Sequence, residues 1–131
     1  MKRVNYSSGA PLEQKMGYSR AVRIGEFIFV GGTTSVQPDG SVYGDGDSYA
    51  QVKYILEKQI ALVEQAGGRK EDVYEIRMFW TPAFDKSGMR AYTELFHDVM
   101  PLCTAVTISS LNRPSQLVEI EMAAAVHAEL S

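Results

Sequence analysis

The sequence predicts an α+β protein in which a six-stranded, mostly antiparallel sheet carries two helices on one face. Two long segments place apolar residues at steps of three and four, which is typical of amphipathic helices. Shorter segments rich in β-branched and aromatic residues are separated by Gly, Pro and Asn, and these predict strands. Because two helices cannot cover both faces of such a sheet, we expect them to lie together on one face.

The N-terminal quarter is expected to supply three strands. They are residues 3–6, 19–24 and 26–31. The second and third should form a hairpin that turns at Gly25, and residues 7–18 between the first two are loop-like. The pair Gly31-Gly32 permits either a bulge or a simple strand end.

The helix expected over about 47–66 is the clearest element. Asp47 or Ser48 can cap it, and Ser48 and Gln51 have the spacing of a capping box. Gly67-Gly68 provide a C-terminal stop. One apolar stripe runs along the helix, formed by Tyr49, Val52, Leu56, Ile60 and Val63.

The C-terminal half predicts a strand, a second helix and two final strands. Their expected ranges are 73–81, 86–98, 103–109 and 118–127. In the strand at 73–81, alternation should divide the side chains between two faces, with Tyr74, Ile76, Met78 and Trp80 on one and Glu75, Arg77 and Thr81 on the other.

The last two strands also predict a subunit interface. One face of the final strand is apolar and suited to the helices, with Val118, Ile120, Met122, Ala124 and Val126. The opposite face is small and partly acidic, with Leu117, Glu119, Glu121, Ala123 and Ala125. We expect a small-residue set on the preceding strand to continue that second face, with Cys103, Ala105, Thr107 and Ser109. A weakly polar surface of this kind favours oligomerisation.

Composition narrows the functional classes. A chain of 131 residues fits one domain spanning 1–131, and its net charge of -3 provides no basic surface for nucleic acid. The single Cys103 excludes an internal disulfide, and no apolar run is long enough for a signal peptide or a membrane span, so we expect a cytoplasmic protein. His97 and His127 have no ligand spacing around them, and we expect neither a metal nor a cofactor.

Four stretches together resemble the Rid (YjgF/UK114) family. They are residues 17–22 (GYSRAV), 29–34 (FVGGTT), 66–73 (AGGRKEDV) and 117–121 (LVEIE). Their order and spacing match along nearly the whole chain. The resemblance implies a chorismate-mutase-like fold, a homotrimer whose sheets form a central barrel, and a small-molecule cleft at each subunit boundary. Members of the best-known branch hydrolyse enamines and imines derived from amino acids.

The resemblance also implies roles for individual residues. Tyr18 matches the family's cleft tyrosine, Gly32 a glycine whose backbone approaches the ligand, and Glu119 the acid proposed to handle the attacking water. Cys103 stands where the deaminases carry an arginine that clamps the substrate carboxylate, and a thiol cannot replace that planar cation. Four arginines are candidate replacements, with Arg113 preferred among Arg20, Arg23, Arg77 and Arg113.

Each of these residues also has a simpler interpretation. Glu119 can be a salt-bridged interface residue, Tyr18 can pack at a cleft rim, and Cys103 is more often a small buried apolar residue than a nucleophile. The sequence therefore favours a Rid-type hydrolase of small enamines, imines or related C=N compounds. The alternative is a trimer that binds a metabolite or regulates a partner without catalysis. An endoribonuclease or translation inhibitor is disfavoured by the sequence pI near 5.4.

Overall fold

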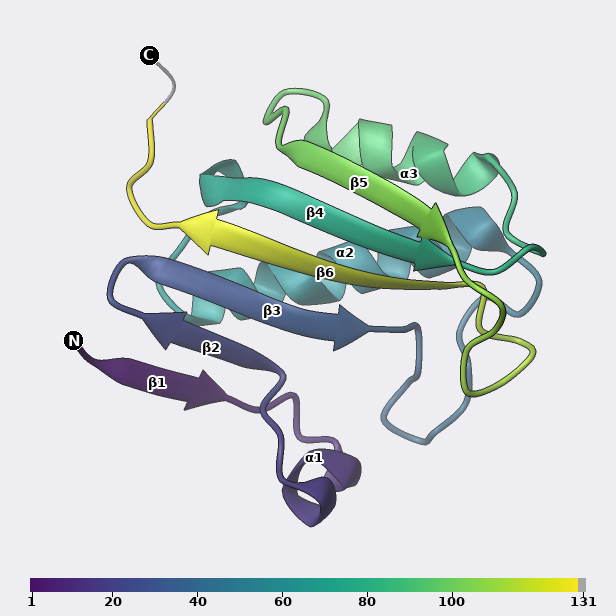
Figure 1. Ribbon diagram of the computed structural model, residues 1–131, viewed down its shortest axis with the longest axis horizontal. Helices are drawn as coiled ribbons and strands as arrows, with labels where there is room; N and C mark the ends of the chain where they lie inside the picture. Colours follow the sequence, from purple (N-terminus) through teal and green to yellow (C-terminus); the bar gives the residue numbers. More distant parts are fainter. Residues whose placement is uncertain (130–131) are drawn as a thin grey trace.

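Six strands form one mixed sheet in this computed structural model, which describes residues 1–129. The strands are β1 (Arg3–Tyr6), β2 (Ala21–Ile24), β3 (Phe27–Thr33), β4 (Val73–Trp80), β5 (Leu102–Thr107) and β6 (Val118–Ala125). Their order across the sheet is β1-β2-β3-β6-β4-β5, as Figure 1 shows. The β4–β5 pair is parallel and the other neighbouring pairs are antiparallel, so the predicted mostly antiparallel sheet is confirmed.

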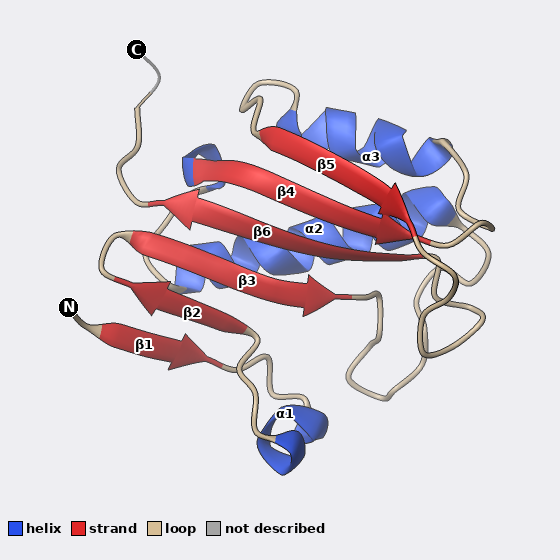
Figure 2. Cartoon of the chain, viewed as in Figure 1, coloured by secondary structure: helices blue, strands red, loops and turns tan. Residues whose placement is uncertain are grey.

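Both long helices cover the same face of the sheet, as predicted (Figure 2). They are α2 (Ser48–Gln65) and α3 (Ser87–Phe96). Asp47 caps α2, because its side chain accepts a hydrogen bond from the Ala50 amide at 2.9 Å. The expected capping box is wrong: the Gln51 side chain is buried, accepting from the Leu117 amide and donating to the Ser115 carbonyl. Gln51 therefore ties the start of α2 to the loop before β6.

A short helix that the sequence did not predict, α1 (Pro11–Met16), lies within the expected loop over 7–18. Pro11 occupies its first position, where a missing amide hydrogen costs nothing. Gly17 ends it in the left-handed conformation at φ 90°. Six residues are too few for a helical period to show in the sequence, but one of them, Glu13, is buried. A 3-10 turn, η1 (Lys70–Asp72), leads into β4.

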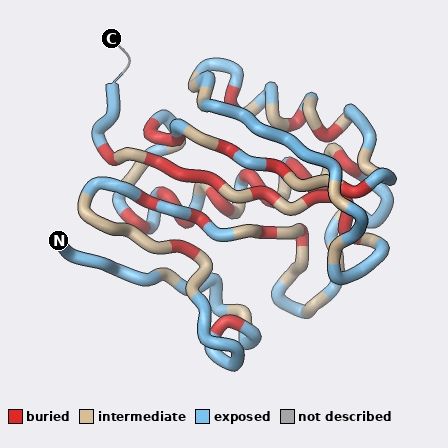
Figure 3. Tube along the Cα trace, viewed as in Figure 1, coloured by how far each residue is buried: buried red, intermediate tan, exposed pale blue. Residues whose placement is uncertain are grey.

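The core fills the space between the sheet and the helices, and its buried residues come mainly from the central strands and from α2 (Figure 3). Ile28, Ile55 and Ile120 are fully buried there. Gln59 of α2 lies among them and donates to the Ile120 carbonyl at 2.7 Å, so a polar contact joins helix and sheet inside the core.

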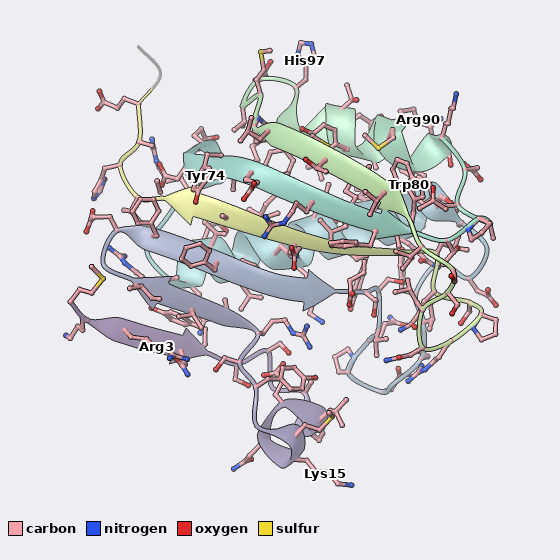
Figure 4. All side chains as sticks on the ribbon, in the orientation of Figure 1. Arg3, Lys15, Tyr74, Trp80, Arg90 and His97 are labelled. Atoms are coloured by element: carbon pink, nitrogen blue, oxygen red, sulfur yellow. The ribbon has the colours of Figure 1, made fainter. Side chains whose placement is uncertain are left out.

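Strand β4 departs from the predicted alternation at its start. Its register against β6 shifts between Val73 and Glu75. Val73 is buried, whereas Tyr74 is 36% exposed and its ring meets that of Phe27 at 6.3 Å. Tyr74 thus lies on the face without helices, here called the open face, and not on the face of Ile76 and Met78 as expected (Figure 4). A bulge reverses the facing of every residue on one side of it, and composition does not reveal a bulge.

Strand β5 also presents the opposite set of residues to that expected. Cys103 pairs with the fully buried Ile76, and Thr107 accepts a hydrogen bond from the Trp80 indole at 3.1 Å, so these side chains are on the helix side. The expectation that Cys103 continues the face of Glu119 is therefore wrong. The sequence defines the alternation, but the partner strand decides which set faces which side.

Removing the cap of α2 should destabilise the protein measurably. Asp47→Ala is expected to lower the free energy of unfolding by about 1 kcal/mol, since the Ala50 amide loses its acceptor. Urea unfolding would measure this loss. Asp45→Ala, an exposed aspartate two residues earlier, is the matched control and should change stability by less than about 0.5 kcal/mol. Equal losses in the two variants would contradict the capping role.

Candidate functional site

The candidate site lies where β3 and β6 lose regular pairing. Their register shifts between Val30 and Thr33, and Gly32 lies within that irregularity. A Cβ atom on Gly32 would lie 2.9 Å from Cδ of Glu119 and 3.1 Å from its Oε2. A side chain at residue 32 would displace the Glu119 carboxylate from this position. The structure therefore brings together two of the predicted site residues.

Arg20 supplies the cation beside this pair. Its guanidinium Nη1 donates to the Gly32 carbonyl, and its charge acts on Glu119. The backbone of Arg20 is fixed as well, because its amide donates to Tyr6 and its carbonyl accepts from Gly31. Arg113, which the sequence favoured as the replacement for the deaminase arginine, donates instead to the Gly40 carbonyl in the loop before α2.

Tyr18 lies beside Arg20 and is 39% exposed. The guanidinium carbon of Arg20 is 5.4 Å from the centre of the Tyr18 ring, a cation–π contact. Tyr18 also lines a surface hollow of about 530 Å³ whose walls include Arg3 and Asn5 of β1. The predicted cleft tyrosine is therefore next to both the cation and an open space.

Glu13 is a component of the site that the sequence reasoning missed. Its carboxylate is 2% exposed and accepts hydrogen bonds from the Ser7 hydroxyl and from the Ser8 amide and hydroxyl. Its Oε2 lies 3.5 Å from Nε of Arg20. Burial alone would raise the pKa of Glu13, but the bonds from Ser8 and Ser7 and the charge of Arg20 together hold it below the ordinary value. Nothing in the local sequence marks this glutamate, because its partners meet it only in the fold.

The electrostatics of Glu119 suit proton transfer. Burial raises the pKa of the Glu119 carboxyl, and Glu121 raises it further, while Arg20 acts in the opposite direction. Glu121 is itself bound by Arg77 of β4 at 2.7 Å. A carboxyl with a raised pKa exchanges protons more readily near neutral pH than an ordinary glutamate does.

Cys103 is separated from these groups within one chain. It lies on edge strand β5 and faces the helix side, where Tyr92 of α3 is its neighbour. Glu119 lies on β6, two strands away from β5, and faces the other side of the sheet. Burial raises the pKa of the Cys103 thiol despite the Tyr92 hydrogen bond, and burial also raises the pKa of Tyr92 to about 12. The thiol therefore has no feature of an activated nucleophile.

Comparison with known proteins shows the family to which this chain belongs. Residues 9–126 match the family described as Endoribonuclease L-PSP. This chain belongs to the Rid (YjgF/YER057c/UK114) family. Among solved structures, the Rid-family protein Rv2704 of Mycobacterium tuberculosis superposes with a TM-score of 0.83 at 34% identity, covering 95% of this chain and 100% of that one.

Two other relatives are similar to this chain in sequence over most of its length. A RutC family protein of Pyrococcus horikoshii is 32% identical over 123 residues, which is 92% of this chain and 95% of its own. An uncharacterized protein of Streptomyces coelicolor is 32% identical over 118 residues, covering 89% and 87% of the two chains.

The described residues form neither a metal site nor a membrane-spanning helix. Within residues 1–129 there is no cluster of three or more His, Cys, Asp or Glu side chains placed to hold a metal ion. None of the helices described is long and apolar enough to cross a membrane.

The close approach at Gly32 is directly testable. Gly32→Ala should displace the Glu119 carboxyl and lower the free energy of unfolding by about 1 kcal/mol, the low end for overpacking, because the added methyl meets only the end of a side chain that can move aside. Gly31→Ala is the matched control: its Cβ would meet only the Arg20 carbonyl at 3.5 Å, an ordinary contact. Chemical denaturation of both variants measures the difference. A Gly32 variant as stable as the Gly31 variant would show that Glu119 does not need the space.

Proposed function

We propose that this Rid protein hydrolyses small enamines, imines or related C=N compounds at clefts between the subunits of a homotrimer. The observation that carries the proposal is the Glu119 carboxyl, partly desolvated and packed on Gly32, with the Arg20 guanidinium beside it. Tyr18 contacts Arg20 and lines the surface hollow next to it. The acid–base group can transfer the protons of the hydrolysis, and the cation can bind an anionic group of the substrate.

The proposed reaction needs no cofactor. Glu119 takes a proton from a water molecule as the water oxygen bonds to the carbon of the C=N group, and it returns that proton to the nitrogen. Glu119 next transfers the hydroxyl proton of the adduct to that nitrogen as the C–N bond breaks, which releases ammonia and leaves a carbonyl product. An enamine follows the same route once a proton is added to its β-carbon and one is lost from its nitrogen, which makes it an imine. Arg20 would stabilise negative charge on the substrate, in place of the arginine that Cys103 replaces.

The alternative, a trimer that binds a metabolite without turning it over, is favoured by one observation. Cys103 provides neither a cation nor a low-pKa thiol at the position where the family's deaminases carry arginine. Nuclease activity is the third possibility because of the family description, but the net charge of -3 opposes it. On the open face, Arg77 is already paired with Glu75 and Glu121.

Glu119→Gln separates the hydrolase from the binding protein. With freshly generated 2-imino acids and neutral enamines, ammonia release should fall by about 10²–10⁴-fold in the variant while the carbonyl product still binds. Ammonia release by Glu121→Gln, which removes a neighbouring carboxylate on the same strand, should change far less. Absence of turnover by the wild-type protein across the panel, with ligand binding intact, would favour the alternative.

The pH dependence follows from the pKa of Glu119. A general base is active only when deprotonated, so kcat/KM should rise with pH through that pKa. Since burial raises it, this acid limb should lie above the ordinary glutamate range. The pH–rate profile measures the limb. A limb at the ordinary value, or one that persists in Glu119→Gln, would assign the proton transfer to another group.

The proposed trimer rests on the apolar character of the open face. Five large side chains on this face are 36–65% exposed, namely Phe27, Phe29, Tyr74, Leu102 and Val106. The ring centres of Phe27 and Phe29 are 6.4 Å apart, so the aromatic groups form a continuous patch. A patch of this kind favours burial against another subunit.

Sedimentation equilibrium should give about three times the chain mass of 14.5 kDa. Phe29→Asp should shift the protein toward monomer, because it places a charge in the patch. Tyr43→Asp, equally exposed at 44% but outside the sheet, should leave the trimer intact. A wild-type monomer at micromolar concentration would exclude a cleft between subunits.

A further inference from the structure

Arg20 lies near two carboxylates but pairs with only one of them. Its Nε is 3.5 Å from Oε2 of Glu13. Glu119 is near enough for the charge of Arg20 to act on it, yet among residues 1–129 no ion pair within 4.0 Å joins the two. The Gly32 carbonyl, which accepts from Nη1, and the Tyr18 ring are the other neighbours that hold the guanidinium.

Among residues 1–129, the pairing with Glu13 is the only compensation that Nε of Arg20 receives. This atom is buried and makes no hydrogen bond, so the nearby Glu13 charge is what compensates it; the Arg20 and Glu13 side chains are 16% and 3% exposed. A buried cationic group without an opposite charge is strongly unfavourable and moves toward another anion if one is available. Without Glu13, the available anion would be Glu119.

Glu13 cannot follow Arg20 toward Glu119. The Ser7 and Ser8 hydroxyls and the Ser8 amide hold its carboxylate at the start of α1. The other charged group facing this pair is Lys58 of α2, whose pKa is lowered by burial and by Arg20. Lys58 adds positive charge and so increases the need for Glu13.

We propose that Glu13 is a positioning residue that keeps Arg20 from closing onto Glu119. Arg20 then remains available to an anionic group of the substrate, and Glu119 remains able to exchange a proton. The inference rests on the proposed function for the role of Glu119, but the arrangement of charges that it describes exists without a substrate. Its test therefore needs no turnover.

The test is a ¹³C NMR titration of the Glu119 carboxyl, assigned by its absence in Glu119→Gln. In Glu13→Gln, Arg20 should move onto Glu119, and the pKa of Glu119 should fall. The matched control, Glu64→Gln, removes an exposed carboxylate from α2 and should leave the pKa of Glu119 unchanged. The charges acting directly on Glu119 are Arg20 and Glu121, so removing Glu13 has its effect only through Arg20.

A double-mutant cycle with Arg20→Gln tests whether Glu13 affects the pKa of Glu119 through Arg20. The Glu13→Gln shift should disappear in the Arg20→Gln background. An unchanged or raised pKa of Glu119 in Glu13→Gln, or the same fall without Arg20, would overturn the inference. If Glu13→Gln does not fold, Glu13→Asp withdraws the charge by one methylene and should produce a smaller shift of the same sign. Failure of ammonia release with the NMR shifts as expected would reject the proposed function alone.

Discussion

The irregular pairing of β3 with β6 at Gly31-Gly32 is the constraint on which the candidate site depends. A regular antiparallel ladder would pair the Gly32 backbone with β6, and any larger residue would fill the space that the Glu119 carboxyl occupies. The bulge frees the Gly32 carbonyl to accept from Arg20 instead. One backbone irregularity thus places an acid and a cation on either side of the same glycine.

The charges around this glycine form a connected set. Glu13 compensates Arg20, Arg20 lowers the pKa of Glu119, and burial raises it. The pKa of Glu119 reflects both burial and Arg20, because desolvation favours the neutral acid while the cation favours the carboxylate. The buried Glu13 in turn depends on α1, whose six residues have few contacts of their own to hold them against the sheet. The N-terminal segment is therefore part of the site and not only an edge of the fold.

The two faces of the sheet have different requirements. The helix side is filled by apolar residues and by the buried glutamines Gln51 and Gln59, which satisfy backbone groups of the loop before β6 and of β6 itself. The open face combines the Phe27–Phe29–Tyr74 patch with the acidic residues of β6. Because the apolar patch and the ionisable groups share one face, burial of that face in an assembly would further desolvate Glu119.

The sequence by itself determined the two long helices, the six strands and the family. The stripe on α2, the Gly25 turn and the alternation in β6 are local patterns, and the motifs containing Tyr18, Gly32 and Glu119 are readable without a structure. Only the tertiary structure decided which face of the sheet some side chains occupy and which charged groups lie together. Register placed Tyr74 and Cys103 on the faces opposite to those expected, because a bulge and a parallel partner act through neighbouring strands. It also selected Arg20 over Arg113 as the cation beside Glu119 and brought Glu13 to it, because charges separated in the sequence meet only after the chain has folded.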